Sequence, residues 1–202
     1  MGRIVKECTD IIADEVESVK NLVSEFSQFA RFPAAQPVRC DLNEVVESAL
    51  AVFNGRLDGI ELRADLSPGL PAVSVDKEQF KRVIVNLVDN AAEAMQDSLV
   101  KRLWIATRPG APDTVELLVA DTGCGVTPED KEKLFLPYFS TKGRGTGLGL
   151  AIANHILSEH NAHIRVEDNL PAGARFTIEI PAAVDAGEEP RPAESVAPVT
   201  HV

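Results

Sequence analysis

The sequence has no apolar run long enough to cross a membrane, which takes about 18 or more residues. Its N-terminus also lacks the order of basic and then apolar residues that marks a secretory signal peptide. Cysteine is scarce, since only Cys8, Cys40 and Cys124 occur, at scattered spacings that do not suggest a disulfide framework. We therefore expect a cytoplasmic chain with free thiols and no membrane segment.

Positive charge is also in short supply. Lys and Arg number 20 against 31 Asp and Glu, so the formal net charge is −11 and the isoelectric point is near 4.8. A chain this acidic is repelled by the phosphates of nucleic acids and of anionic membranes, so neither is an expected partner. Any phosphate-bearing ligand would need local cations or a metal ion to offset its charge.

With 202 residues, of which 45% are hydrophobic, the chain is long enough for one full domain and additional segments. Residues 3–31 contain neither Gly nor Pro, and their apolar residues recur at steps of three and four, as on one helix face. So broad an apolar stripe predicts a partner helix or a second copy of the chain. The predicted divisions are this helical segment at 1–32, a hinge at 33–37, the main domain at 38–181 and a disordered tail at 182–202.

The main domain is predicted to be α/β, a two-layer α+β sandwich with helices on one face of a mixed sheet. Its strongest helical pattern covers about 77–96 and begins after Asp76, a suitable N-cap. Other helices are expected at about 41–53 and 147–160, with a helical turn at 127–130. Strands are expected at 38–40, 60–66, 72–75, 103–107, 114–120, 164–167 and 175–180.

One glycine-rich stretch, residues 119–150, organises the rest of the chain. Asp121 ends an apolar strand, and glycines follow it at 123 and 125 and again at 143, 145, 147 and 149. Glycines at this density let backbone N–H groups approach a ligand closely, and the N-terminus of the helix that follows favours an anion. We expect the polar segment between the two glycine clusters to be a mobile cover. The stretch predicts a nucleotide pocket with phosphates near the second cluster.

Three polar side chains in this pattern have a specific chemical use. A carboxylate such as Asp121 accepts a hydrogen bond from an exocyclic amine, which favours adenine over guanine. Asn86 and Asn90 lie four positions apart and therefore on one face of the predicted helix. An Asn carbonyl oxygen is a suitable ligand for Mg²⁺, an ion that bridges to substrate phosphates. Each residue also has an interpretation without a binding role. Asp121 could cap a turn at the end of its strand, and Asn86 and Asn90 could be ordinary helix residues.

Three other motifs fit less well. A phosphate loop needs a Lys after its last glycine, and G-x-G-x-x-G needs glycine where this sequence has Leu148, Leu150 or Ile152. The run at 119–123, apolar-apolar-Asp-Thr-Gly, is also the signature of an aspartic protease, whose dimer pairs two such carboxylates. That interpretation gives the Asn pair and the distal glycines no role, and Cys124 is an unusual residue at its position.

Five segments resemble, in the same order, the N, G1, F, G2 and G3 boxes of sensor histidine kinases. They are NLVDNAAEAM (86–95), DTGCGV (121–126), LFLPYFSTK (134–142), GTGLGLAIA (145–153) and GARFTIEIP (173–181). The resemblance covers nearly all of 38–181 and implies the Bergerat ATP-binding fold of the GHKL superfamily, which gyrase, mismatch-repair and heat-shock chaperone ATPases share. It also implies the catalytic domain of a two-component signalling kinase, with ATP and Mg²⁺ as cofactors.

The resemblance carries over to individual residues. It implies that Asn90 binds Mg²⁺, that Asn86 supports this ion or reaches a phosphate, and that Asp121 recognises the adenine amine. His155 and His160 are interpreted as structural. The other expected site residues are Gly123, Gly125 and Thr177 near the base, Gly145, Thr146, Gly147, Leu148 and Gly149 along the triphosphate, Lys142 and Arg144 as cations, and Phe135, Pro137, Tyr138 and Phe139 as lid anchors.

Position 86 also discriminates within the superfamily, because the ATPase branches usually have a glutamate there that activates water. The amide of Asn86 cannot act as a general base. The sequence therefore predicts phosphoryl transfer to another group rather than hydrolysis.

The sequence departs from the family at its front. Residues 3–31, whose end forms part of FSQFARFP, resemble only the second helix of the dimerisation hairpin, most like the nitrogen-regulation type, and no His precedes His155. The phospho-accepting His of the family lies on the first helix. We therefore expect a protein-histidine kinase domain that homodimerises through 3–31 and acts with a response regulator and a supplied acceptor helix, but does not phosphorylate itself. Any membrane anchor of such kinases would lie in a preceding part.

Two alternatives remain open. In the first, the same fold is an interaction module that uses residues 3–31 to regulate a partner kinase or response regulator. In the second, the chain is a serine/threonine anti-sigma kinase of the same superfamily, which the helix at 3–31 and the F box disfavour.

Overall fold

The computed structural model describes residues 34–140 and 146–183, together with Lys6, Thr9, Ile12, Val16 and Lys20. Those five residues lie in helical backbone and are exposed. The rest of the predicted helix at 3–31 and the predicted tail from residue 184 onward lie outside the described residues. The pairing of that helix therefore stays a prediction.

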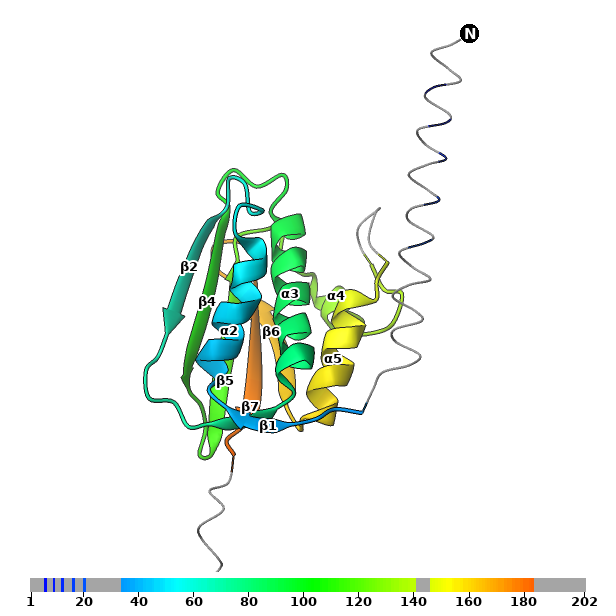
Figure 1. Cartoon of the computed structure of the whole chain (residues 1–202). Coiled ribbons are helices and arrows are strands. Elements are labelled where there is room, and N and C mark those ends of the chain that lie inside the picture. The colour runs from blue at the N-terminus through cyan, green and yellow to red at the C-terminus, as the bar shows by residue number, and fades with distance from the viewer. Residues whose placement is uncertain are drawn as a thin grey trace, which may run out of the picture.

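A five-stranded mixed sheet forms one layer of the domain, in the order β2-β4-β5-β7-β6 (Figure 1). Strand β2 runs parallel to β4, and the other neighbours are antiparallel. The strands are β2 (Glu61–Leu66), β4 (Arg102–Pro109), β5 (Thr114–Asp121), β6 (His163–Asp168) and β7 (Ala174–Pro181). A separate antiparallel pair joins β1 (Val38–Cys40) to β3 (Val73–Val75).

Helices cover one face of this sheet and form the second layer. Figure 1 shows α2, α3 and α5 side by side over the sheet, with α3 in the middle, and α3 contacts both of its neighbours. The helices are α2 (Leu42–Leu50), the 3₁₀ turn η1 (Ala51–Phe53), α3 (Lys77–Ala94), α4 (Pro128–Lys131) and α5 (Gly149–Glu159). The predicted two-layer fold is confirmed, and the element boundaries agree with the sequence prediction to within about two residues.

The central helix α3 is fixed by its cap and its apolar face. The side chain of Asp76 accepts hydrogen bonds from the backbone N–H groups of Glu78 and Gln79, both at 3.1 Å, and so caps the first turn. The apolar stripe predicted from the period of the sequence is buried throughout, and consists of Phe80, Val83, Ile84, Leu87, Val88, Ala91 and Met95. Burial of this stripe leaves the polar face of α3, with its two Asn residues, toward α5 and the outer surface.

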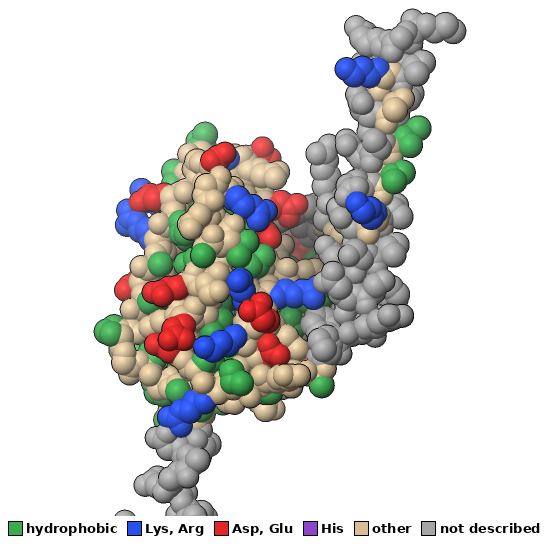
Figure 2. Space-filling model, viewed as in Figure 1, with side chains coloured by type: hydrophobic (Ala, Val, Ile, Leu, Met, Phe, Trp, Pro, Cys, Tyr) green, Lys and Arg blue, Asp and Glu red, His purple; other side chains and the backbone are tan. Residues whose placement is uncertain are grey.

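The other face of the sheet has no helical layer in the described part of the chain. Along β4, Leu103, Ile105 and Thr107 are buried while Arg102 and Trp104 are exposed, as the alternation of a strand requires. Figure 2 shows the molecule from the helical side, where acidic and basic side chains are interspersed and apolar ones scattered.

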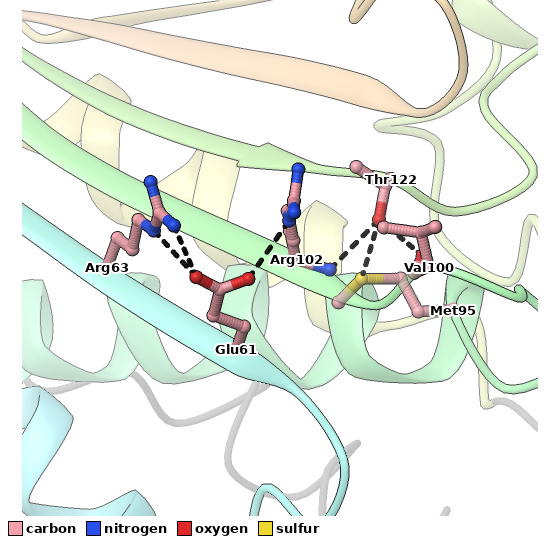
Figure 3. Close-up of polar contacts among 6 residues, drawn as sticks. All are labelled: Glu61, Arg63, Met95, Val100, Arg102 and Thr122. Atoms are coloured by element: carbon pink, nitrogen blue, oxygen red, sulfur yellow. Dashed lines mark hydrogen bonds and ion pairs between the residues drawn. The ribbon is translucent and has the colours of Figure 1, made fainter.

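Ion pairs cover the open face of the sheet. Glu61 accepts hydrogen bonds from Arg63 (2.8 Å) and Arg102 (2.9 Å), as Figure 3 shows, and these two arginines lower the pKa of Glu61 below its ordinary value. Beside them the Thr122 hydroxyl accepts a hydrogen bond from the backbone N–H of Arg102 (2.9 Å) and donates one to the backbone carbonyl of Val100 (2.7 Å). These bonds hold the segment between α3 and β4 against the end of β5.

Leu87→Ala is expected to lower the free energy of unfolding by about 2–5 kcal/mol, because the Leu87 side chain is fully buried and its removal leaves a cavity. The control is Leu99→Ala in the exposed loop after α3, which should change that free energy by less than about 0.5 kcal/mol. Equilibrium urea denaturation measures both values. Equal losses for the two variants would contradict the packing of α3 described above.

Candidate nucleotide-binding site

The two Asn residues of α3 are oriented by hydrogen bonds to the backbone. The Asn90 side-chain Nδ2 donates to the carbonyl of Asn86, one turn earlier, at 2.8 Å. The Asn86 Nδ2 donates to the carbonyl of Gly149 at 3.0 Å, across to the first residue of α5. Each amide therefore uses a donor to fix its orientation, and its carbonyl oxygen is the atom with the chemistry of a Mg²⁺ ligand.

Asp121 is held at the end of β5 by its neighbours. Its side chain is buried, with 2% exposure, and Oδ1 accepts from the N–H groups of Gly123 (2.8 Å) and Ala174 (3.3 Å). The Asn169 side chain donates to the Asp121 carbonyl at 2.7 Å. The turn between β6 and β7 thus positions this carboxylate, and backbone donors offset part of the cost of burying it.

Close backbone approaches bring the Asp121 loop against α3. A methyl group on Gly123 would lie 2.7 Å from backbone atoms of Ala94, the last residue of α3, and the Cys124 N–H donates to the Ala94 carbonyl at 3.1 Å. Gly125, at φ +73°, packs its backbone against Gly173. The loop after β5 can dock on the C-terminal end of α3 only because glycine stands at 123, which brings Asp121 close to the helix that carries Asn90.

Gly147, in the described part of the second glycine cluster, packs against two of the predicted lid anchors, Tyr138 and Phe139. Gly147, at φ +68°, accepts a hydrogen bond from the Tyr138 N–H at 3.0 Å, and a methyl group on Gly147 would lie 2.6 Å from the Tyr138 backbone. Leu148 is fully buried and its carbonyl accepts from Ile152 at 2.8 Å, which starts α5. The first turn of α5 is therefore held beside Asn86 and leaves N–H groups of the kind that bind anions.

The segment between the two glycine clusters begins as a short capped turn. The Thr127 side chain caps α4, and Lys131 forms an ion pair with Asp168 on β6 at 2.8 Å. Of the predicted anchors, Phe135 packs against the hydrophobic core, whereas Pro137 and Tyr138 are exposed and Phe139 is half-buried. Lys142, Arg144 and Gly145 lie outside the described residues.

Most of the predicted site residues are brought together, but Thr177 is not. Thr177 pairs with Leu118 on one side and Arg165 on the other, while its neighbours Phe176 and Ile178 point into the core under the helices. Strand alternation therefore directs Thr177 to the open face of the sheet, away from α3 and α5. On β7 it is Ala174 that contacts Asp121. The sequence predicts a turn around Asn169 and Ala174, but it does not indicate that either residue contacts Asp121.

A hollow of about 360 Å³ lies along the flank of α3 that carries Asp89 and Glu93. Its lining includes Arg56, Asp89, Glu93 and Lys101. Partial burial raises the pKa of the Asp89 carboxyl, Arg56 opposes that rise and Glu93 adds to it. Asp89 and Glu93 therefore belong to this hollow and not to the group around Asn86.

A comparison with protein families agrees with this geometry. The family described as histidine kinase-, DNA gyrase B-, and HSP90-like ATPase matches residues 75–184. The chain belongs to this family. The match begins just before α3 and includes the Asn pair, the Asp121 loop and both glycine clusters.

Relatives in this family are sensor kinases. The sensor protein FixL of Bradyrhizobium diazoefficiens is 32% identical over 181 residues, which is 89% of this chain and 36% of FixL. The catalytic domain of the histidine kinase ThkA aligns with a TM-score of 0.65 and 31% identity, covering 73% of this chain and 96% of that domain. ThkA in complex with the response regulator TrrA aligns with a TM-score of 0.72 and 26% identity, over 89% of this chain and 52% of ThkA.

The chain spans about a third of the length of the curated relatives it matches. The predicted ATPase domain of histidine kinases is confirmed by these matches, whereas the nitrogen-regulation type stays a prediction. Within the described ranges, no helix combines the length and the apolar character that a bilayer crossing requires.

Gly173→Ala tests the closure around Asp121. A methyl group on Gly173, at φ +109°, would lie 1.9 Å from the Asp121 carbonyl oxygen. The control is Gly59→Ala, which has the same kind of backbone strain at φ +74° but nothing within 4 Å of the added methyl. Gly173→Ala should lower the free energy of unfolding by about 1–3 kcal/mol more than the control.

Thermal denaturation and a titration with ADP measure the two consequences. Only Gly173→Ala should also weaken ADP binding, because it displaces Asp121. If the two variants behaved alike in both measurements, the close approach of these backbones would be wrong.

Proposed function

We propose that this domain binds Mg-ATP and supplies its γ-phosphoryl group for the phosphorylation of histidine in a two-component signalling system. The observation that carries the proposal is the bond from the Asn86 amide to the Gly149 carbonyl at 3.0 Å. It joins the helix with the Mg²⁺-type amides to the helix N-terminus that suits a phosphate. The loop after Asp121 contacts Ala94, at the C-terminal end of the same helix.

The adenine end is proposed to lie at Asp121. Its Oδ1 already accepts from the N–H groups of Gly123 and Ala174, which fixes the plane of the carboxylate. A carboxylate fixed in this way accepts a hydrogen bond from the exocyclic amine of adenine, whereas guanine presents a carbonyl there. Gly123 and Gly125 let this loop pack closely against Ala94 and Gly173, and the base is proposed to lie beside the loop.

The phosphate end is proposed to lie between α3 and the first turn of α5. The amide oxygens of Asn86 and Asn90 fit a Mg²⁺ ion, which usually has few protein ligands and completes its shell with waters and substrate phosphates. When bound, this ion neutralises charge on the phosphates. The residues of the chain hold the phosphates in place: Gly147, Leu148 and Gly149 form the turn against them, and Lys142 and Arg144 supply positive charge.

The identity of residue 86 supports transfer rather than hydrolysis. An amide has no basic site that could take a proton from an attacking water. The nucleophile is instead proposed to be the imidazole of a histidine on a separate acceptor helix, because no His precedes His155 in this sequence. In this step the ring nitrogen bonds to the γ-phosphorus while the bond from that phosphorus to the β–γ bridging oxygen breaks. ADP leaves with the bridging oxygen, and the proton of the other ring nitrogen is released to water.

The partners follow from the same proposal. Because ThkA, a similar histidine kinase, forms a complex with the response regulator TrrA, we propose a response regulator as a partner here. We also propose that residues 3–31 pair two copies of the chain, that the chain acts in the cytoplasm, and that it does not phosphorylate itself. Any membrane anchor would lie in a preceding part.

A second candidate function is an interaction module of the same fold. It is favoured by Ile12 and Val16, two apolar side chains on one helix face that are 63% and 62% exposed. Such side chains are typical of a contact surface. This alternative requires binding of a partner kinase or response regulator through residues 3–31 without nucleotide, and a chain that remains monomeric and binds no regulator would exclude it.

Asp121→Asn tests the adenine end. The substitution keeps the size of the side chain and one acceptor oxygen for the backbone, but replaces the other oxygen with a donor. We expect ADP affinity to fall by about 10- to 100-fold, as for the loss of one buried hydrogen bond to a charged group. Isothermal titration measures it, with Asp65→Asn on the exposed edge strand β2 as the control. Unchanged affinity would refute the assignment of Asp121.

Asn86→Asp tests the phosphate end. The new carboxylate cannot donate to the Gly149 carbonyl and adds a negative charge beside the triphosphate, so Mg-ATP binding should weaken by about 10-fold or more. Transfer of labelled γ-phosphoryl to a supplied acceptor helix should fall with it, and Asn54→Asp on the exposed surface is the control for charge.

The unchanged protein should release no inorganic phosphate above background without an acceptor. Steady release from it would contradict the proposed reaction.

A further inference from the structure

Asp76 has a distant partner in addition to its role as a helix cap. Its Oδ1 accepts from the first turn of α3, while Oδ2 accepts from the backbone N–H of Gln36 at 3.0 Å. Gln36 lies 40 positions earlier, in the short segment 34–37 that precedes β1. One carboxylate therefore fixes both the start of α3 and the segment through which the chain enters the domain.

His160 links the same point to α5. Its Nε2 accepts from the backbone N–H of Asp76 at 2.9 Å, and its Nδ1 lies 2.7 Å from the Ile156 carbonyl. Since a carbonyl only accepts, Nδ1 carries the proton and the ring is the neutral tautomer. The ring is buried and packs edge-on against Phe80 at 5.3 Å between centroids. His160 therefore ties the last turn of α5 to the first turn of α3.

The two helices are consequently joined at two places. Asp76 and His160 connect the start of α3 to the end of α5, and Asn86 and Gly149 connect the middle of α3 to the start of α5. Figure 1 shows the two helices side by side, with the segment before β1 passing under their lower ends. A displacement at the lower joint changes the relative position of the helices, and hence the upper joint, because each helix is a rigid rod.

The charge of Asp76 supports the lower joint. Partial burial raises the pKa of its carboxyl, but hydrogen bonds from the backbone N–H groups of Gln36, Gln79 and Glu78 outweigh this and lower the pKa below its ordinary value. Asp76 is therefore ionised at neutral pH, and its hydrogen bonds are charge-assisted, which makes them stronger than bonds between neutral groups.

We propose that Asp76 and His160 are positioning residues for phosphoryl transfer, which couple the segment 34–37 to both helices of the nucleotide site. A shift of that segment acts through Asp76 on Asn86 of α3, and through His160 on the first turn of α5. The inference rests on the proposed function for its effect on transfer, but the coupling itself concerns only the protein.

Asp76→Asn separates the two roles of this side chain. Asn caps a helix as well as Asp does, so the first turn of α3 keeps its acceptor. The side-chain NH₂ then replaces the oxygen that accepts from Gln36, so this bond is lost. The matched control is Asp41→Asn, because Asp41 also caps a helix, α2, through the Asn43 N–H at 2.8 Å.

Gln36→Pro removes the same bond from the other side, since proline has no N–H. Its control is Ala35→Pro, which places a proline in the same segment at a residue whose N–H donates no hydrogen bond within the described part of the chain. Asp76→Asn and Gln36→Pro should each lower the rate of transfer from saturating Mg-ATP to a supplied acceptor helix by about 3- to 30-fold. Both should leave the affinity for ADP within about 3-fold of the original.

Hydrogen exchange of the first-turn amides of α5, without nucleotide, is the second readout. These amides should exchange faster in both variants than in either control, and the double variant should match the single ones, because one bond is removed in each case. Additive effects, or equal effects in Asp41→Asn and Ala35→Pro, would overturn the coupling. If the unchanged protein did not bind ADP, the proposed function would be refuted. The hydrogen-exchange result would still test the coupling of Gln36 to the two helices through Asp76 and His160.

Discussion

The site depends most on the side-chain bond between Asn86 and Gly149. An amide that donates across two helices sets the distance between them, and here it sets the distance between a Mg²⁺-type ligand and a helix N-terminus. Neither feature alone would identify a nucleotide site, since Asn residues and helix N-termini are common. Their fixed separation makes them complementary to phosphates and a metal ion together. The buried Leu148 keeps the turn that presents Gly149 in this position.

Much of this arrangement could be predicted from the sequence, for physical reasons that differ between the parts. The period of apolar residues in α3 fixes which face is buried, and that face determines where Asn86 and Asn90 lie. The glycine at 123 is informative because only a residue without a side chain fits against Ala94. Motifs of this kind encode local geometry, so they predict a candidate site as well as the fold.

The parts that the sequence did not reveal depend on contacts between distant strands. The sequence predicts Thr177 beside the adenine end, but strand residues alternate, and a shift of one position moves a side chain to the opposite face of the sheet. The contacts of Asn169 and Ala174 with Asp121 form only when the β6–β7 turn closes over β5. No local pattern encodes such a closure. The link between Gln36 and Asp76 was missed for the same reason.

The acidity of the chain gives a further reason why this site should be selective for metal-bound nucleotide. A net charge of −11 opposes the approach of a free triphosphate, and the backbone donors of a helix N-terminus supply only about half an elementary charge. Lys131, the first cation after the Asp121 loop, is already paired with Asp168. In the proposed complex, a metal ion together with Lys142 and Arg144 would supply much of the neutralising charge. Oriented amides then have a clear advantage over carboxylates as ligands, because they bind the ion without adding negative charge.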